Sequence, residues 1–302
     1  MLYHIKFLKV PTATKEGYKS VLSLSNDLGD ALFHGSAEIG IEVGKRRSKV
    51  TWSPGDRSVT VITAPGPIFR ATVLSSRDDL FPDQPARFLD LYAQAVNGKF
   101  PAKSIRKFDS IPLTIKEDTG NSIARHVWDA GVTLAHTLTK ERIYEQITGK
   151  DSSQQVGILE LGAGCGIVGL AVEKHLGGQG SLILSDLEEA RECAEESIAL
   201  NNSSASFMAL DWADEDVSQL TNLDLIIVAD CTYNMDMYET LVACLERLLK
   251  ANPSAKVVIG HKMRNEQESE FFEMLEQRLK VERDSTESVG VQVRVVVAKM
   301  KE

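Results

Sequence analysis

The chain has 302 residues, of which 43% are hydrophobic and 25% are charged, and its formal net charge at pH 7 is −9. This composition is typical of a globular protein with enough length for one large domain or two smaller ones. It argues against a membrane protein, because no stretch approaches the roughly 18 uninterrupted apolar residues that a spanning helix needs. The charge is uneven: residues 1–110 contain 16 Lys and Arg against 11 Asp and Glu, whereas residues 111–302 contain 18 against 32.

The cysteines and the charge distribution restrict the compartment and the partners. Four cysteines stand at positions 165, 193, 231 and 244 without a C-x-x-C pair or a neighbouring His cluster. This spacing predicts reduced thiols in a cytoplasmic protein that could also be nuclear, and no metal site. The amino-terminal stretch MLYHIKFLKV contains two lysines and no small-residue cleavage site, so it does not resemble a signal peptide. The acidic second region argues against a nucleic-acid partner and suits a basic one better, although an acidic surface facing water is the simpler explanation.

The first 110 residues show the alternation of half-buried strands. Apolar side chains alternate with others over 37–43, 50–52 and 59–61, and turn residues separate these runs. The basic segment KRRSK at 45–49 is interpreted as a hairpin loop facing water. A helix is expected over 83–98, where an aspartate and a proline precede apolar residues at helical spacing and a glycine follows them. These residues are Asp83, Pro85, Phe88, Leu91, Tyr92, Ala95 and Gly98. No catalytic motif is recognisable in this region.

From about residue 111 the pattern changes to strands that alternate with helices. Strands are predicted at 156–161, 181–185, 205–210, 223–229 and 255–260, and helices at 167–176, 187–200, 237–250 and 265–279. Such alternation predicts βαβ units and a parallel sheet. The last two apolar segments, KVERD and VQVRVVVAKM, are separated by a short turn, so they predict an antiparallel hairpin at the end of the sheet.

A glycine-rich loop follows the first predicted strand of this region, in the sequence VGILELGAGCG at 156–166. Closely spaced glycines let the backbone turn tightly and approach a ligand where any Cβ would collide. The next helix directs its amino-terminal amides at the same ligand, which indicates a nucleotide-like cofactor. Read from Gly164, the loop matches the dinucleotide pattern G-x-G-x-x-G, but the strand ends at Leu161, so Gly162 is the first glycine of the turn. The loop alone does not identify the cofactor.

Two acidic residues near the loop separate the candidate cofactors. Asp186 ends the second strand, where a carboxylate can accept hydrogen bonds from both ribose hydroxyls, and NAD and S-adenosylmethionine sites share this feature. Glu160 precedes the glycines and would place negative charge near the cofactor. A carboxylate there is unfavourable beside a pyrophosphate but compatible with the amino group and sulfonium of S-adenosylmethionine. A salt bridge at the edge of the strand would also explain Glu160.

A set of motifs in order makes the resemblance specific. They are Trp128-Asp129-Ala130-Gly131, LELGAGCGIVGL at 159–170, SDLEEA at 185–190, Leu210-Asp211-Trp212 and ADCTY at 229–233. Over roughly residues 111–300 the chain resembles the seven-β-strand S-adenosylmethionine methyltransferases, and within them the lysine methyltransferase family also called methyltransferase family 16. Asp230-Cys231-Thr232-Tyr233 fits the D-x-x-Y signature of that family. The resemblance implies an α/β, Rossmann-like, seven-stranded sheet with a carboxyl-terminal antiparallel hairpin, in a methyltransferase domain at 111–302 preceded by a β-rich accessory region at 1–110.

The resemblance also implies roles for particular residues. Asp230 and Tyr233 would face the methyl acceptor. S-adenosylmethionine would lie against one set of residues: Trp128, Glu160, Gly162, Gly164, Asp186, Leu187, Asp211, Trp212 and Ala229. Glu160 and the two glycines would line its methionine part, Asp186 would hold the ribose, and Asp211 with Trp212 would flank the adenine. Taken singly, each tryptophan could be an ordinary core residue, and it is their joint occurrence that supports these roles.

The function implied is transfer of a methyl group to a lysine of a protein substrate by a monomeric enzyme. Three alternatives stay open at this point. A methyltransferase of a small molecule or RNA would use the same cofactor pocket, and a non-catalytic relative would use the β-rich region as a scaffold. An NAD oxidoreductase is the weakest alternative, because no histidine among His126, His136 and His261 has a sequence neighbour that suggests a proton donor.

Overall fold

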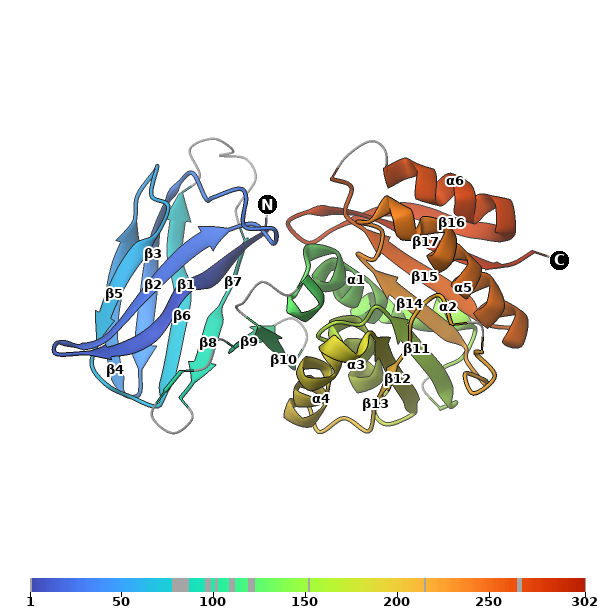
Figure 1. The fold of residues 1–302 in the computed structure, drawn as a ribbon, viewed down its shortest axis with the longest axis horizontal. Coiled ribbons are helices and arrows are strands. Elements are labelled where there is room, and N and C mark those ends of the chain that lie inside the picture. Colours follow the sequence, from blue (N-terminus) through green and yellow to red (C-terminus); the bar gives the residue numbers. More distant parts are fainter. Residues whose placement is uncertain are drawn as a thin grey trace. The chain divides into compact units, whose positions relative to one another are not determined.

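The structure is a computed structural model that describes residues 2–77, 87–95, 99–100, 103–108, 112–118, 123–151, 153–214, 216–264 and 268–301. The chain forms two compact units, Met1–His126 and Val127–Glu302, here called the N-terminal unit and the C-terminal unit (Figure 1). This division lies beyond the boundary expected at residue 110, because a hairpin over 103–118 extends a sheet of the N-terminal unit. Within the described ranges, no helix has the length and apolar character needed to cross a membrane.

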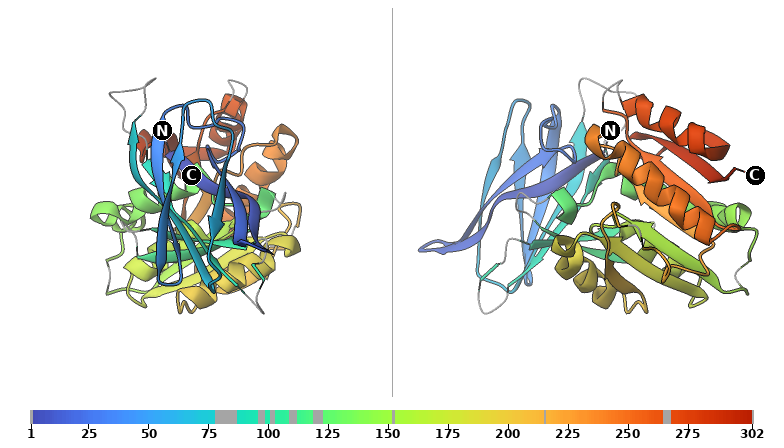
Figure 2. Two further views of the ribbon diagram at one scale, coloured as in Figure 1. Left: turned by 90° about the vertical axis from the view of Figure 1, so that its left-hand side faces the viewer. Right: turned by 45° about the vertical axis from the view of Figure 1, so that its right-hand side comes forward.

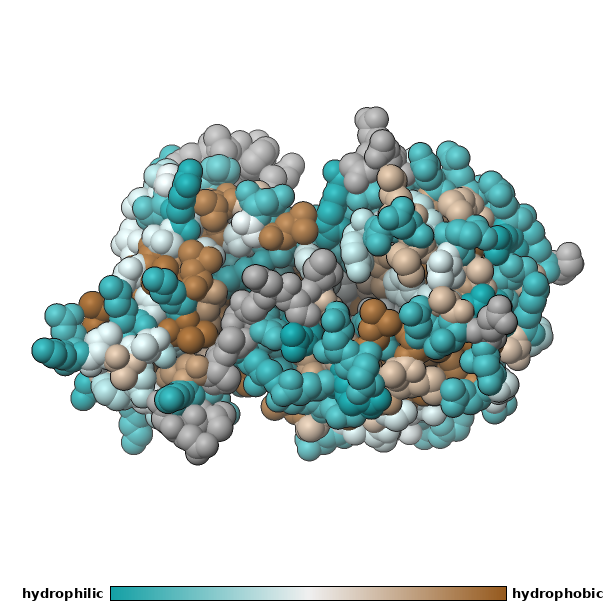
Figure 3. All heavy atoms as spheres, in the orientation of Figure 1, coloured by the Kyte–Doolittle hydropathy of each residue, from teal (hydrophilic) through white to brown (hydrophobic). Residues whose placement is uncertain are grey.

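The N-terminal unit consists of two β-sheets. Its described strands are β1 (Leu2–Thr14), β2 (Gly17–Ser25), β3 (Ser36–Val43), β4 (Arg46–Trp52), β5 (Val59–Thr63), β6 (Ile68–Arg77), β7 (Arg87–Leu89), β8 (Leu91–Gln94), β9 (Lys103–Phe108) and β10 (Leu113–Asp118). One sheet has the order β5-β2-β1-β7 and the other β10-β9-β8-β6-β3-β4. Inward side chains of both sheets, such as Leu22, Ile39 and Phe69, form one apolar core. Brown apolar patches also reach the surface of this unit between teal polar ones (Figure 3).

The expected alternation is confirmed and two other expectations for this unit are wrong. Buried and partly exposed residues alternate along β3 without interruption. The helix expected over 83–98 is absent from its described part, where β7 and β8 lie instead; Asp83, Pro85 and Gly98 lie outside the described residues. Apolar residues at helical spacing also fit a strand over so short a run, and pairing of β8 with β6 buries Leu91 and Ala93. The KRRSK segment lies mostly in β4 rather than in a loop.

A buried arginine joins the two sheets of the N-terminal unit. Arg106 on β9 has its side chain 1% exposed and forms an ion pair with Glu117 on β10. Its Nη1 donates to the carbonyl oxygen of Ile5 on β1 at 2.7 Å, and also to those of Leu89 and Asp90. The charge of Arg106, with a hydrogen bond from His126, holds the pKa of Glu117 well below its usual range against the effect of burial. The ion pair is therefore fully formed at neutral pH.

The C-terminal unit is a mixed seven-stranded sheet with helices on both faces (Figure 2). Its described elements are α1 (Asp129–Thr139), η2 (Lys140–Arg142), α2 (Ile143–Thr148), β11 (Val156–Leu161), α3 (Ile167–His175), β12 (Gly180–Asp186), η3 (Glu188–Ala190), α4 (Arg191–Leu200), β13 (Ser206–Ala209), β14 (Leu225–Ala229), η4 (Met235–Met237), α5 (Tyr238–Ala251), β15 (Lys256–His261), α6 (Ser269–Arg278), β16 (Leu279–Ser288) and β17 (Gln292–Met300). The short helix η1 (Ile123–Arg125) belongs to the end of the N-terminal unit. The sheet order is β13-β12-β11-β14-β15-β17-β16. The predicted strands, helices and closing hairpin are confirmed, and with them the predicted fold class.

The strand order reverses between β11 and β14. From β11 the chain continues outward through β12 and β13, and it then returns to the other side of β11 as β14 and β15, all of them parallel. The side chains of Ile226 and Val228 join the core with α5 and α6, whereas Gly260 faces Leu134 of α1 and Glu160 faces α3. The helices that follow β11 and β14, α3 and α5, therefore lie on opposite faces of the sheet. In open α/β sheets ligands bind at the carboxyl ends of the strands beside such a reversal.

The ion pair of Arg106 generates a prediction about the N-terminal unit. Glu117→Gln leaves the guanidinium buried without its anionic partner, which costs about 3–5 kcal/mol in comparable buried pairs. Because the pKa of Glu117 is lowered by folding, its contribution is present above about pH 4.5 and is lost as the pH falls below that value. We therefore expect hydrogen exchange of peptides from residues 2–77 to accelerate in Glu117→Gln at pH 7, and the difference from the unmodified protein to shrink in acid.

Glu38→Gln is the matched control for this experiment. It removes the same charge from an ion pair with Lys49 whose side chains are 41% and 61% exposed. Exposed pairs of this kind contribute at most about 1 kcal/mol. Equal exchange rates in the two variants would contradict the role given to the buried pair.

Candidate functional site

The glycine loop after β11 lies directly against the segment after β14. Gly162, Gly164 and Gly166 have φ values of 60°, 52° and 77°, a region that side chains with a Cβ rarely adopt. A Cβ at Gly162 would lie 2.5 Å from Sγ of Cys231 and 3.2 Å from the ring of Trp212. The loop therefore needs glycine for its conformation and for close approach. Its backbone is held beside the residues that follow β13 and β14.

Glu160 lies beneath the loop and holds the start of α3. Its side chain is buried on the face of the sheet that α3 covers. Its Oε2 accepts a hydrogen bond of 2.7 Å from the amide of Gly169. Burial raises the pKa of Glu160 to about 8, although the amides of Gly169 and Val168 act in the opposite direction. A Cβ at Gly169 would approach this carboxylate to 2.8 Å. The last glycine of the apparent dinucleotide pattern is therefore explained by packing against Glu160.

Asp186 connects the end of β12 to the glycine loop. One carboxylate oxygen accepts from the amide of Gly164 and the other from the amide of Leu187, each at 2.7 Å. Burial raises the pKa of Asp186 while these two amides lower it. Each oxygen has a second lone pair, so the carboxylate can accept further hydrogen bonds from a ligand. The side chain of Leu187 itself is half exposed.

The segment after β13 places Trp212 at the loop and Asp211 toward water. Trp212 is partly buried, and its carbonyl oxygen accepts from Arg247 of α5 at 2.7 Å. Asp211 is exposed and accepts from the amide of Ala213 through one oxygen. The tryptophan ring is thus held in a fixed position near Gly162, and its neighbouring carboxylate stays accessible.

Asp230 begins the segment after β14 and is paired with an arginine. It has a φ of 58°, and its amide donates to the carbonyl oxygen of Gly260. Its two carboxylate oxygens accept from Nη1 and Nη2 of Arg264 at 2.7 and 2.6 Å. The same guanidinium lies 5.8 Å from the ring centre of Trp128. Trp128, Asp230 and Arg264 therefore form one cluster, whose arginine the sequence analysis did not identify.

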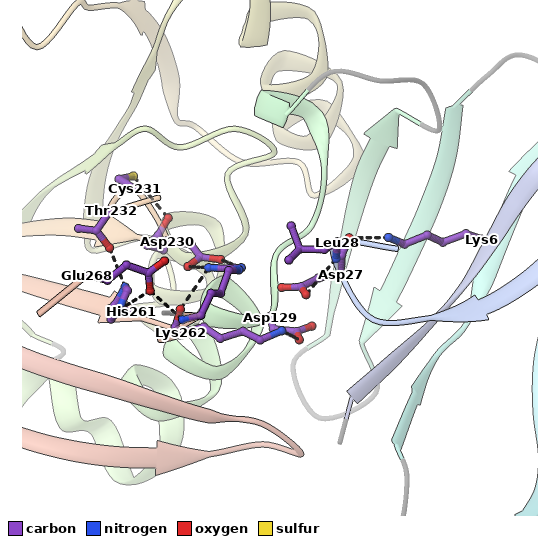
Figure 4. A network of polar contacts seen from close by, with 12 residues as sticks. Lys6, Asp27, Leu28, Asp129, Asp230, Cys231, Thr232, His261, Lys262 and Glu268 are labelled. Carbon is purple, nitrogen blue, oxygen red and sulfur yellow. Dashed lines mark hydrogen bonds and ion pairs between the residues drawn. The ribbon is translucent and has the colours of Figure 1, made fainter. Parts of the chain in front are cut away.

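A second ion pair lies next to this cluster. Lys262 donates from Nζ to Asp129 at 2.7 Å, and the carboxylate of Asp129 is almost fully buried at the start of α1. Lys262 and Arg264 both belong to the loop after β15, in the sequence HKMR, and Lys262 is labelled in Figure 4. The sequence signal available for these two residues was a pair of cations, separated by one residue, after a predicted strand. That strand lies next to the strand that precedes Asp230. Without the strand order, nothing in the sequence connects them to Asp129 and Asp230.

A buried polar chain supports the segment after β14 from below. Thr232 Oγ1 and His261 Nδ1 lie 2.6 Å apart, and His261 Nε2 lies 3.3 Å from Oε2 of Glu268 (Figure 4). The hydroxyl of Tyr238 donates to the carbonyl oxygen of Thr232. Burial lowers the pKa of His261, so this ring is neutral at physiological pH. These contacts fix the backbone between Asp230 and Tyr233.

The two other predicted residues of this segment differ in exposure. Ala229 is the last residue of β14 and pairs with Gly260 of β15. Tyr233 has 57% of its surface exposed. Partial burial raises the pKa of Tyr233, and the nearby groups of Cys231, Asp186 and Glu189 add to this effect. Its ring therefore lies largely at the surface.

The predicted site residues thus gather at one edge of the sheet, around the reversal of strand order. Asp211 and Tyr233 lie at its exposed margin and Glu160 lies beneath it. In the part of the chain that the structure describes, no group of three or more His, Cys, Asp and Glu side chains could hold a metal ion.

The raised pKa of Glu160 predicts how stability changes with pH. A carboxyl group whose pKa is higher in the folded protein stabilises it below about pH 4.5, and this contribution is lost as the pH rises through about 8. The free energy of unfolding should therefore decrease over this window with a slope of at most about 1.4 kcal/mol per pH unit. Glu160→Gln, which mimics the protonated form, should lack this component, so its stability relative to the unmodified protein should improve steadily from pH 5 to pH 8 in urea titrations.

Glu195→Gln serves as the control, because this exposed carboxylate on α4 pairs with Arg191 at the surface. A difference between Glu160→Gln and the unmodified protein that stays constant with pH would show that Glu160 is already ionised in the folded state.

Comparison with known proteins agrees with this arrangement. A family model described as lysine methyltransferase matches residues 107–278, more than half of the chain. A UPF0665 family protein of Schizosaccharomyces pombe is 24% identical, and the match covers 89% of this chain and 91% of that protein. EEF1A lysine methyltransferase 3 of Xenopus tropicalis is 27% identical over 61% of this chain and 75% of its own length. Protein-lysine N-methyltransferase EFM6 of Saccharomyces cerevisiae is 26% identical over 56% and 76%.

Solved structures show a more distant likeness. The mitomycin 7-O-methyltransferase MmcR gives a TM-score of 0.42 at 18% identity, covering 55% of this chain and 55% of that one. A SAM dependent methyltransferase from Aquifex aeolicus gives a TM-score of 0.40 at 19% identity, covering 53% of this chain and 89% of that one. The family match rests instead on the sequence, and it includes the motifs from Trp128 to Tyr233. The chain therefore belongs to the lysine methyltransferase family and is an S-adenosylmethionine-dependent methyltransferase.

Proposed function

We propose that this methyltransferase acts on the side-chain amine of a lysine in a protein substrate. The observation that carries the proposal is the position of Asp230-Cys231-Thr232-Tyr233 at the carboxyl end of β14, directly beside Gly162. This position suits an acceptor, because it adjoins the loop that suits the cofactor. The names of two relatives, protein-lysine N-methyltransferase EFM6 and EEF1A lysine methyltransferase 3, point to the same class of substrate.

The residues at the edge of the sheet fit S-adenosylmethionine. The left-handed glycines let a ligand approach the loop backbone closely, and Asp186 has lone pairs left for the ribose hydroxyls. Trp212 offers an aromatic face for the adenine, and the exposed Asp211 can accept from its exocyclic amine. Glu160 lies beneath the loop, so we propose that it supports Gly162 and Gly164 on the methionine side through α3. When bound, the cofactor supplies a methyl group that its sulfonium has already activated.

For methyl transfer, the protein must orient the acceptor amine, and the amine must have lost its proton. Holding the reacting atoms in line can contribute roughly 7–11 kcal/mol. A lysine amine with a pKa of about 10.4 carries a proton at pH 7, and removing it costs on the order of 4 kcal/mol. We propose that Asp230 accepts a hydrogen bond from the amine and that Trp128 and Tyr233 form the walls of its channel. Ala229 would lie beneath the cofactor at the end of β14.

The direct test uses S-adenosylmethionine with a labelled methyl group in a eukaryotic cell lysate. Parallel samples are digested with protease or with RNase, and the labelled protein is hydrolysed to identify the modified amino acid. Label that protease alone removes and that migrates as methyl-lysine supports the proposal. Label in RNA, in a small-molecule fraction or on another amino acid would reject it, while leaving the methyltransferase assignment in place.

Replacement of Asp186 should weaken cofactor binding. Asp186→Ala removes the acceptor proposed for the ribose, and an unpaired buried polar group costs about 1–3 kcal/mol, which corresponds to a loss of affinity of roughly 5- to 100-fold. Calorimetric titration with S-adenosylmethionine and its demethylated product measures this loss. Glu188→Gln, at an exposed carboxylate two residues further on, should bind as the unmodified protein does. Unchanged affinity in a folded Asp186→Ala protein would show that the ribose is held elsewhere.

Replacement of Asp230 should impair transfer rather than cofactor binding. Asp230→Asn removes a charged acceptor whose hydrogen bond is worth roughly 1.5–3 kcal/mol, so methylation should slow by about 10- to 100-fold while the cofactor dissociation constant changes little. Asp236→Asn changes an exposed carboxylate in η4 in the same way and should leave both quantities unaltered. An equal loss of cofactor affinity and rate in Asp230→Asn would place Asp230 in the cofactor site instead.

A further inference from the structure

The loop after β15 neutralises the carboxylates at the proposed acceptor position. Asp230 and Asp129 are both buried, and each forms an ion pair with a cation of this loop, Arg264 and Lys262 respectively. These four side chains come from the start of α1, the residue after β14 and the loop after β15, and Figure 4 shows Asp129, Asp230 and Lys262 among them. A lysine amine that reaches Asp230 therefore meets a paired carboxylate rather than an isolated one.

Arg264 is held in place by several contacts. Its backbone amide donates to Oε2 of Glu268 at 2.7 Å, and Nη1 donates to the carbonyl oxygen of Lys262 at 3.2 Å as well as to Asp230. The guanidinium also lies over the ring of Trp128, and its side chain is 17% exposed. Bidentate pairing with a carboxylate fixes both distance and orientation. These contacts therefore fix the side chain of Arg264 within the cluster around Asp230.

This pairing leaves Asp230 able to accept a hydrogen bond. Each carboxylate oxygen has two acceptor positions, and Arg264 uses one on each oxygen. An isolated carboxylate would bind an ammonium in preference to an amine and would raise the pKa of the acceptor lysine, which opposes methyl transfer. A guanidinium at 2.6–2.7 Å cancels most of this preference while the hydrogen-bond acceptor remains.

We propose that Arg264 is a positioning residue that compensates the charge of Asp230, so that the site binds the acceptor lysine as a neutral amine. This inference rests on the proposed function. In this proposal, Arg264, which lies outside the D-x-x-Y segment, determines whether the site binds the protonated or the neutral form of the lysine. The proton of the lysine is then lost to solvent before the amine enters, and no residue of the cluster needs to take it.

The other ionisable groups nearby do not compensate the charge of Asp230 in place of Arg264. Among the described residues, Cys231 and His261 interact electrostatically with Asp230, His261 also interacts with Arg264, and Glu268 accepts from the amide of Arg264. Glu160 and Asp186 act in turn on Cys231, and Glu268 and Arg294 on His261. Burial raises the pKa of Cys231 well above its usual range and lowers that of His261, so both are neutral near pH 7. Lys262 is already paired with Asp129. The cation that directly contacts both oxygens of Asp230 is Arg264.

The test measures binding of n-butylamine, which carries the amine of a lysine side chain, to the full chain saturated with demethylated cofactor. Dissociation constants are determined by NMR titration at pH 7, 8, 9 and 10 for the unmodified protein, Arg264→Gln and Arg264→Lys. If the unmodified protein takes the neutral amine, its affinity for total butylamine should rise about tenfold per pH unit up to pH 10. Arg264→Lys should behave similarly. Arg264→Gln should bind the ammonium, with an affinity at pH 7 at least tenfold higher than that of the unmodified protein and almost independent of pH.

Three outcomes would overturn the inference. A tenfold rise per pH unit in Arg264→Gln, at unchanged affinity, would show that Arg264 does not select the protonation state. The same rise at uniformly tighter binding would show that Arg264 merely blocks the amine position. If butylamine did not bind saturably to the unmodified protein, this would show that the proposed amine site does not exist. Arg283→Gln on β16 removes the same charge from a surface pair and should match the unmodified protein.

Folding and the proposed function are controlled separately. Thermal unfolding of each variant shows whether it is folded, and Arg264→Met replaces Arg264→Gln if the latter is not. Butylamine binding does not require methyl transfer to a protein, so failure of the lysate assay with the expected butylamine results would reject the protein-lysine substrate alone. Where a substrate is found, the pH at which kcat reaches half of its plateau, which reports the bound complex, should be higher in Arg264→Gln than in the unmodified protein and retained in Arg264→Lys.

Discussion

The reversal of strand order between β11 and β14 is the constraint on which the site depends. Because α3 leaves β11 toward one face and the segment after β14 leads to α5 on the other, the two loops separate and leave room at the carboxyl edge of the sheet. The gap is narrow: a single Cβ at Gly162 would collide with Cys231. Glycine at this position therefore keeps the cofactor loop and the D-x-x-Y segment adjacent without filling the space between them.

Most of the C-terminal unit could be predicted because its signals are local. Buried parallel strands such as β11 and β14 are continuous apolar runs, and each is followed by a helix with its own periodicity. The N-terminal unit was harder, since the short run around Leu91 fits a helix and a strand equally well. Its pairing with β6, which is distant in sequence, decided between them. The end of that unit was missed for a similar reason, as β9 and β10 join a sheet whose other strands lie far earlier in the chain.

The candidate site likewise contains residues that local sequence motifs predict and residues that only the three-dimensional arrangement reveals. The motifs placed the anionic candidates in or near the ends of strands: Asp186 ends β12 and Asp230 directly follows β14. Lys262 and Arg264 were not predicted, since their importance comes from the adjacency of β14 and β15 rather than from any motif. The carboxylate of Glu160 accepts a hydrogen bond from Gly169 of α3, a contact that the sequence analysis did not anticipate. Burial of this carboxyl group raises its pKa although the hydrogen bond from Gly169 acts in the opposite direction, and the sequence alone does not indicate this burial.

The balance of charge at the edge of the sheet bears on the chemistry of the acceptor. The region as a whole is strongly acidic, which favours the approach of a basic protein segment through long-range attraction. At the proposed acceptor position, however, Asp129 and Asp230 are both neutralised by cations within 2.7 Å. Attraction at a distance and neutrality at short range serve different steps. Under the proposed function, the first would gather positively charged lysines, whereas the second would remove the energetic advantage of keeping the proton on the one lysine that enters.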